Sequence, residues 1–224
     1  MNRPDHNLRL SRGSGIIRPP GGESVCVIGV GGIGSNAVHM LASMGITDFE
    51  VVDPDLVGEE NIFPGFFRMA DDGARKVDVM WHYATDMGGI TVNPFFGEFI
   101  DWDQPRRFTF GIISTDNTET RREIYPHLRE KCQVVLDGRM GGKLCSVFTV
   151  CSDDDVAGEV YESYLEGENA ELPCGQKATA PLTKGMIPFM IGMAVGRHLN
   201  GEEPVFLQRY DMATGMLLNI PAKD

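Results

Sequence analysis

One stretch near the start of the chain constrains the fold more than any other. From Val25 it reads Val-Cys-Val-Ile-Gly-Val-Gly-Gly-Ile-Gly-Ser-Asn, then a helical stretch, then Phe-Glu-Val-Val-Asp-Pro-Asp ending at Asp55. This order predicts a buried strand, a glycine turn, a helix and a second strand that ends on carboxylates. Glycines in such a turn let backbone amides approach a phosphate at the helix N-terminus. The turn contains Gly29, Gly31, Gly32 and Gly34.

An acidic residue at the end of the second strand completes the pattern. Asp53 lies 19 residues beyond Gly34, where a carboxylate can accept hydrogen bonds from ribose hydroxyls. The combination predicts an adenine-nucleotide site. The alternative is a tight strand-to-helix turn whose glycines serve only close packing.

The rest of the chain predicts one α/β domain. With 224 residues it can bury one sizeable core. We expect residues 1–22 to form an N-terminal arm and residues 23–224 a single domain, built as a doubly wound, Rossmann-like, mostly parallel sheet with helices on both faces. The expected later elements are a helix over 71–86, extended chain over 91–99, a central strand over 108–114, a helix over 118–131, strands over 133–137 and 144–151 (the second partly exposed), a buried helix over 186–195 and two short strands within 204–220.

Composition excludes several classes of protein. The net charge of −12 argues against nucleic acid as the main partner, because a phosphate backbone is held by clustered Lys and Arg. The five cysteines contain no Cys-x-x-Cys pair and no secretory signal is visible, so we expect reduced thiols and a cytoplasmic location. The apolar run over 186–195 is too short for a membrane span, which argues against a membrane protein.

Two further polar residues fit a nucleotide site. Residues 73–77 would open a helix whose first turn points Lys76 toward the nucleotide, where it can offset charge on a triphosphate, although a solvated helix residue is the ordinary alternative. Asp116 follows an apolar strand, at the end where open α/β sheets bind ligands, and a carboxylate there is a candidate ligand for Mg²⁺.

These features together resemble the ThiF, MoeB and ubiquitin-activating-enzyme-like adenylyltransferases, from about residue 9 to residue 211. The family activates the C-terminal glycine of ubiquitin-like or sulfur-carrier proteins with ATP. The matching motifs, in order, are Arg9-x-x-Arg12, Gly29 to Gly34, Asp53-Pro54-Asp55 with Asn61, Gly73 to Lys76, Thr115-Asp116-Asn117, and the cysteine, proline and Ile-Gly helix of 174–192.

The resemblance implies a role for each matched residue. Asp53 and Asp55 would belong to the nucleotide site, with Asp53 on the ribose; Asn61 and Lys76 would hold phosphates, and Asp116 would position Mg²⁺. The resemblance also implies that Arg12 reaches the nucleotide of a neighbouring protomer, and therefore a homodimer. Residues 23–224 would then be a single ThiF-like adenylation domain.

The chain also departs from the family. Most members carry arginine where this chain has Pro64, and we expect Arg68 or Arg139 to substitute. The proline and the segment 137–142 resemble a bacterial and phage ThiF-like subgroup. The paired zinc cysteines of many relatives are missing.

Two later features have open functions. Cys174 either accepts the acyl group as a thioester or is a small packing residue. The acidic stretch over 152–173 is expected to be a crossover loop, either solvated or covering the site, and it could steer a basic carrier tail.

Three other functions stay open on the sequence alone. The glycine turn also suits a nicotinamide-dependent oxidoreductase, although hydride transfer needs neither Lys76 nor Asp116. A non-catalytic partner subunit of an adenylating heterodimer would keep the fold, and a relative that adenylates a small molecule or tRNA would keep the chemistry. The sequence does not identify the carrier protein.

Overall fold

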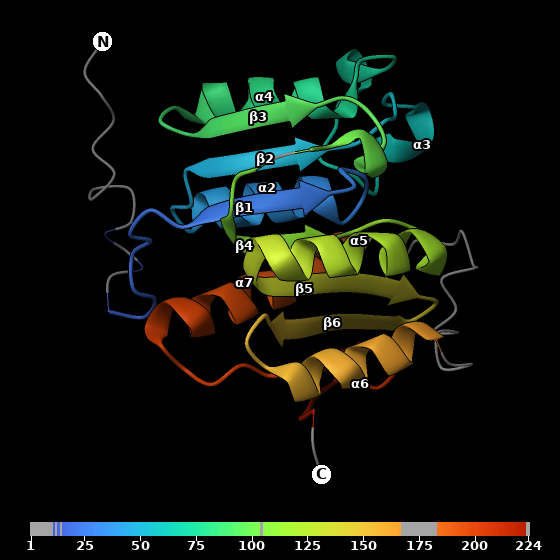
Figure 1. The fold of residues 1–224 in the computed structure, drawn as a ribbon. Coiled ribbons are helices and arrows are strands. Elements are labelled where there is room, and N and C mark those ends of the chain that lie inside the picture. Colours follow the sequence, from blue (N-terminus) through green and yellow to red (C-terminus); the bar gives the residue numbers. More distant parts are fainter. Residues whose placement is uncertain (1–10, 12, 14, 104, 167–182, 223–224) are drawn as a thin grey trace.

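The fold is built on an eight-stranded sheet with five parallel strands at one side (Figure 1). The computed structural model describes residues 11, 13, 15–103, 105–166 and 183–222. The strand order is β3-β2-β1-β4-β5-β6-β7-β8, parallel from β3 to β5 and antiparallel from β5 to β8. The strands are β1 (Ser24–Ile28), β2 (Asp48–Val52), β3 (Thr91–Phe95), β4 (Phe108–Ile113), β5 (Cys132–Gly141), β6 (Leu144–Cys151), β7 (Leu207–Asp211) and β8 (Met216–Ile220).

Helices cover both faces of the sheet, as the sequence predicts. Helices α2, α4 and α7 pack on one face and contribute to one apolar cluster, whereas α5 and α6 pack on the other. The helices are α2 (Gly34–Ser43), α3 (Glu59–Ile62), α4 (Lys76–Met87), α5 (Thr118–Lys131), α6 (Asp155–Glu166) and α7 (Thr183–Asn200), with 3-10 turns η1 (Met69–Asp71) and η2 (Phe99–Asp101). The predicted doubly wound, mostly parallel α/β fold is confirmed.

All five residues of strand β1 are buried, because the strand has helices on both of its faces. Successive side chains of a strand point to opposite faces. Val25 and Val27 accordingly belong to the apolar cluster under α2 and α7, and Cys26 and Ile28 to the cluster under α5. A central strand buried on both faces has no solvated side, so it reads as a continuous apolar run.

The prediction of an acidic crossover loop over 152–173 is wrong for the part of that range that the structure describes. Residues 155–166 form helix α6, which buries Ala157, Tyr161 and Leu165 against the sheet. These residues are spaced by four, so they form one apolar stripe along a helix whose other side carries the acidic residues. Charge therefore marks the solvent face of a packed helix here. The remainder of the predicted loop, from residue 167, lies outside the described residues.

Two other expectations need correction. Strand β6 is buried along six of its eight residues rather than partly exposed, because β5 and β7 pair with it on both sides. Helix α7 runs through Pro188 and extends the predicted buried helix at both ends. Among the described residues, no helix combines the length and the apolar character that crossing a membrane requires.

Candidate functional site

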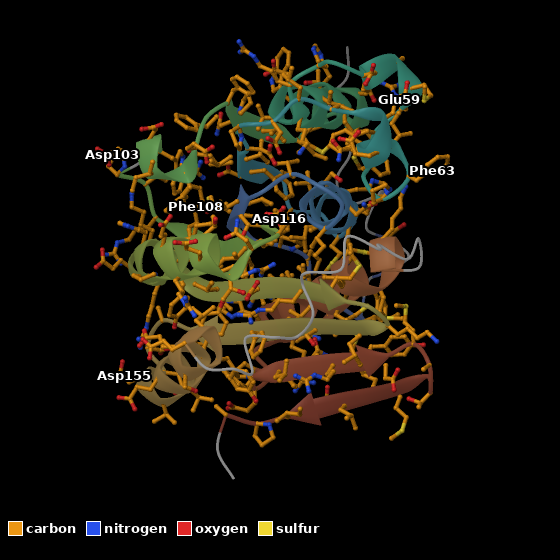
Figure 2. The ribbon with its side chains drawn as sticks, turned by 90° about the vertical axis from the view of Figure 1, so that its right-hand side faces the viewer. Glu59, Phe63, Asp103, Phe108, Asp116 and Asp155 are labelled. Carbon is orange, nitrogen blue, oxygen red and sulfur yellow. The ribbon has the colours of Figure 1, made fainter. Side chains whose placement is uncertain are left out.

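Several of the sequence-predicted site residues follow the carboxyl ends of the parallel strands, with Asp53 and Asp55 after β2 and Asp116 after β4. The strand order reverses between β1 and β4, which are adjacent and pair from Val25–Phe110 to Ile28–Ile113. In doubly wound sheets, ligands bind outside the carboxyl ends of the strands at such a reversal of strand order. Figure 2 looks onto this edge, with Asp116 near its middle.

The glycine turn after β1 is shaped by close packing. Gly29 has φ of +87°, and a Cβ there would lie 3.0 Å from the backbone of Ser114. A Cβ on Gly34 would overlap the carbonyl oxygen of Gly29 and lie 2.7 Å from Ser114 Oγ. A Cβ on Gly31 meets nothing within 4 Å, and one on Gly32 lies 3.3 Å from Pro64 Cβ. Packing thus explains Gly29 and Gly34, while the turn at Gly31 faces open space.

A matched pair of glycine variants tests this difference. We expect Gly34→Ala to lower the free energy of unfolding by about 1–3 kcal/mol, because the new methyl group has no room. Gly31→Ala should stay within about 1 kcal/mol of the unsubstituted protein, since its φ is not positive and its Cβ is unopposed. Urea unfolding of both variants measures the difference. Equal losses of stability would contradict the assignment of Gly34 to packing.

Asp53 fixes the glycine turn from the end of β2. Its side chain is only 4% exposed, the Val30 N–H donates to Oδ2 at 2.6 Å, and the Asp55 N–H donates to Oδ1 at 2.8 Å. Burial raises the pKa of Asp53, and the Val30 N–H and the charge of Lys76 oppose that rise. A carboxylate has about four acceptor positions, so Asp53 retains capacity for ribose hydroxyls.

Lys76 is buried beside these carboxylates. It is the first residue of α4 and is 6% exposed, with Nζ 2.7 Å from Asp55 Oδ2 and 3.8 Å from Asp53 Oδ1. The backbone of Leu56 bridges that of Arg75, which brings the start of α4 to the chain that follows β2. The solvated-helix alternative for Lys76 is therefore wrong. The ammonium is held among carboxylates, where it offsets negative charge.

Asp116 differs from Asp53 in being exposed. The neighbouring Asn117 caps α5, since its Oδ1 accepts from the Thr120 N–H at 2.7 Å. Within the described chain, the Asp116 carboxylate has a single long hydrogen bond, from Asn117 Nδ2 at 3.5 Å, and no ion pair. Asp116 is therefore available for a ligand.

The donor set around Asp116 suits one kind of metal site. Among the described residues, no group of three or more His, Cys, Asp or Glu side chains is arranged to hold an ion. Mg²⁺ is typically bound by one or two carboxylates together with phosphate oxygens and water. The residues present thus fit a magnesium ion that arrives with a nucleotide.

The family assignment agrees with this geometry. A family model described as the ThiF family matches residues 22–221. The chain belongs to the ThiF family.

Curated ThiF-family relatives match parts of the chain. A NEDD8-activating enzyme E1 catalytic subunit from Dictyostelium discoideum is 33% identical over 104 residues, which cover 45% of this chain and 24% of the relative. A tRNA threonylcarbamoyladenosine dehydratase from Haemophilus influenzae is 28% identical over 126 residues, covering 53% of this chain and 48% of the relative. The chain therefore spans at most about half the length of these relatives.

Solved structures share the fold over most of the chain. MccB of E. coli with ATP superposes with a TM-score of 0.70 at 14% identity, covering 89% of this chain and 64% of MccB. Selenomethionine-labelled PaaA superposes with a TM-score of 0.68 at 19% identity, covering 97% of this chain and 66% of PaaA. At these identities the likeness concerns the fold.

Arg68 and Arg139, the two candidates for the missing arginine, both form ion pairs with nearby aspartates. Arg139 is 1% exposed, and its guanidinium lies beneath α6 with Nε 2.5 Å from Asp137 Oδ2. This burial overturns the expectation that Arg139 contacts the nucleotide. Arg68 is exposed and paired with Asp71 at 3.2 Å.

Pro64 and Asn61, which belong to the family motif after β2, contact neighbouring backbone in the structure. Pro64 packs against Gly32, and Asn61 Oδ1 accepts from the Gly58 N–H at 3.1 Å, so its side chain caps α3. Arg12 and Cys174 lie outside the described residues.

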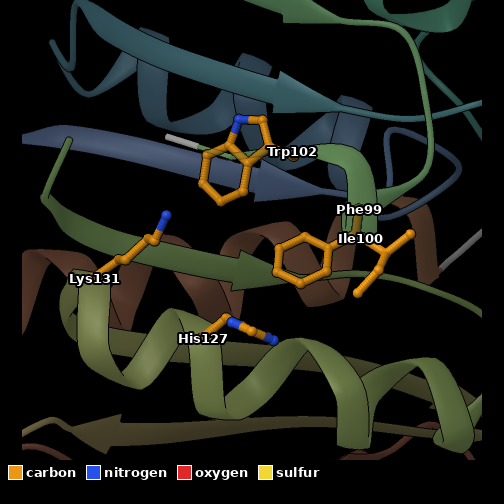
Figure 3. Close-up of a pocket in the computed structure, with 5 residues that line it drawn as sticks. All are labelled: Phe99, Ile100, Trp102, His127 and Lys131. Atoms are coloured by element: carbon orange, nitrogen blue, oxygen red, sulfur yellow. The ribbon is translucent and has the colours of Figure 1, made fainter. Parts of the chain in front are cut away.

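Two cavities in the described part of the chain lie elsewhere. The smaller, of about 40 Å³, lies between η2 and α5 and is lined by Phe99, Ile100, Trp102, His127 and Lys131 (Figure 3). The larger, of about 220 Å³, is lined in part by residues at the amino ends of β1, β4 and β5. Small-molecule sites usually measure several hundred Å³ and, in open α/β sheets, lie at carboxyl ends. We assign the nucleotide to neither cavity.

Sequence reasoning missed one residue close to the site. Arg121, on α5, is 2% exposed and contacts the backbone of Thr115. It lies in line with Ile124, Tyr125 and Leu128, all buried on the same side of α5. Its place on an apolar helical face was the available signal, because a buried position for arginine requires a specific partner.

Proposed function

We propose that this ThiF-family chain is an ATP- and Mg²⁺-dependent adenylyltransferase. Its substrate would be the C-terminal glycine carboxylate of a ubiquitin-like or sulfur-carrier protein, converted to an acyl-adenylate with release of pyrophosphate. The observation that carries the proposal is the gathering of Asp53, Lys76 and Asp116 around the glycine turn, at the point where the strand order reverses. Each of these groups suits a different part of a magnesium-bound nucleotide.

The reaction requires the protein to neutralise charge and align the reactants, and it requires no general base. A carboxylate oxygen of the substrate attacks the α-phosphorus, a phosphorus–oxygen bond forms, and the bond to the departing pyrophosphate breaks. The attacking carboxylate is already ionised at neutral pH, so no general base is required. Repulsion between two anions is the main obstacle, and fixed positive charge and alignment overcome it.

The described residues supply these functions. The turn at Gly31 leaves room for phosphate at the start of α2, and Asp53 would accept from the ribose. The ammonium of Lys76 would offset charge on the phosphates, with Asp55 holding it in place. A magnesium ion held by Asp116 would add further charge neutralisation. Because Asn61 caps α3, its proposed phosphate contact would need a different side-chain orientation.

The substrate class draws support from relatives. One curated relative is named as a NEDD8-activating enzyme subunit, and the fold neighbour MccB has been solved with MccA. Since another relative is named for a tRNA nucleoside, adenylation of RNA is the competing substrate class within the same chemistry. The net charge of −12 favours a protein substrate. The proposal includes a homodimer in which Arg12 reaches the partner's nucleotide, and it ends at the acyl-adenylate, before any thioester on Cys174.

Thermal stabilisation by nucleotides tests the proposal most directly. ATP with Mg²⁺, at about 100 times its dissociation constant, should raise the melting temperature by about 5 °C or more, whereas NAD should leave it unchanged. ATP–pyrophosphate exchange, with small glycine-ended proteins encoded by neighbouring genes as substrates, then tests the acceptor. Stabilisation by NAD alone would instead support the oxidoreductase alternative.

A further inference from the structure

Four polar side chains form a buried cluster behind the loop that carries Asp116. They come from α5, β5 and α6, and each is at most 2% exposed. Asp137 accepts hydrogen bonds from both arginines of the cluster and from the tyrosine, whose hydroxyl donates to Oδ2 at 2.7 Å. The cluster consists of Arg121, Asp137, Arg139 and Tyr161.

Arg121 connects this cluster to the Asp116 loop. Its Nη1 donates to Asp137 Oδ1 and, at 3.3 Å, to the Gly138 carbonyl oxygen. Its Nη2 donates to the Thr115 carbonyl oxygen and also, at 3.3 Å, to the Gly138 carbonyl oxygen. One planar guanidinium therefore joins Asp137 and Gly138 of β5 to the peptide that immediately precedes Asp116.

The same loop is anchored on its other side by β1. The Ser114 N–H donates to the Ile28 carbonyl oxygen at 2.9 Å, and Ser114 Oγ donates to the Gly29 carbonyl oxygen at 2.6 Å. Asn117 fixes the next position by capping α5. Asp116 lies between these anchors, and among the described residues its side chain makes only the long contact with Asn117. Its direction is therefore set by the backbone on either side.

We infer that Arg121 is a positioning residue that holds the Thr115 carbonyl and so aims the Asp116 carboxylate at the nucleotide site. The inference rests on the proposed function of Asp116. Lysine cannot replace arginine here, because a single ammonium does not present the planar fork that reaches Asp137, Gly138 and Thr115 at once. Asp137 supplies the opposite charge that a buried guanidinium requires.

A pair of variants separates positioning from general destabilisation. Arg121→Lys keeps the charge and removes the fork, whereas Tyr161→Phe removes one hydrogen bond from the same buried cluster and leaves the Arg121–Thr115 contact in place. The first readout is amide hydrogen exchange over residues 114–120 in the protein without nucleotide, where the Ser114 and Thr120 amides are hydrogen-bonded. Arg121→Lys should speed exchange there by about tenfold, and Tyr161→Phe should leave it unchanged.

The second readout is the Mg²⁺ concentration that half-saturates ATP binding. It should rise by about tenfold in Arg121→Lys and remain unchanged in Tyr161→Phe, while binding of ATP without Mg²⁺ is the same in all three proteins. Unchanged or equal exchange rates in the two variants would overturn the inference, as would faster exchange with an unaltered Mg²⁺ requirement. If the unsubstituted protein bound no ATP, the proposed function would fail, and the exchange measurement would still show whether Arg121 holds the loop.

Discussion

Asp116→Ala is expected to abolish ATP–pyrophosphate exchange. Asp116 is the exposed carboxylate at the strand reversal, and removing it would leave the phosphates without a protein ligand for Mg²⁺ on that side. Losing one charged contact to a transition state typically lowers the rate by about 10²- to 10³-fold, and losing the metal's anchor should cost at least as much. Exchange with an acceptor protein, and ATP binding with and without Mg²⁺, measure the two parts of the effect.

The effect of this substitution should be confined to the site. Asp116 is exposed and does not cap α5, which Asn117 does, so the free energy of unfolding should change by less than about 0.5 kcal/mol. Glu119→Ala is the matched control, because it removes the same charge from the first turn of α5. It should retain exchange close to that of the unsubstituted protein. Exchange at the unsubstituted rate in Asp116→Ala would remove the proposed mechanism.

Sequence patterns predicted the parallel half of the fold well because its signals are local. A central strand such as β4 must be apolar on both faces, so 108–114 is recognisable without knowing its neighbours. Helix α4 was predicted to start at 71 and begins at Lys76, because Gly73 has φ of +77° and Arg75 is extended. Helix periodicity does not register such a turn. The turn is what places Lys76 beside Asp53.

Prediction was weaker where a residue's role depends on partners far along the chain. Arg139 appeared free to replace the missing arginine, yet it follows Asp137 by two residues on the same strand and faces Tyr161 of α6. Since α6 itself was read as an acidic loop, nothing in the sequence indicated a buried partner on that side. The burial of Lys76 was left open for the same reason, because the start of α4 is held against the chain after β2 by the backbone contact of Leu56 with Arg75.

Lys76→Met is expected to lower exchange by about 10²- to 10³-fold and to weaken ATP binding. Lys76 is buried with carboxylates on two sides, so removing its charge leaves Asp53 and Asp55 facing an incoming triphosphate without the ammonium that lies beside them. Without the lysine, the pKa of Asp53, already raised by burial, should rise further. Exchange rates per folded molecule, together with calorimetric titration of ATP, measure the loss.

The control for this substitution must separate charge at the site from charge in general. Lys143→Met removes an exposed lysine from the turn between β5 and β6, and it should leave both measurements unchanged. Lys76→Met should also be less stable than the unsubstituted protein, since breaking a buried ion pair leaves an uncompensated carboxylate. Urea unfolding therefore accompanies the kinetics. ATP binding of unaltered affinity in folded Lys76→Met would show that the ammonium serves only Asp53 and Asp55, and that charge neutralisation at the phosphates comes from elsewhere.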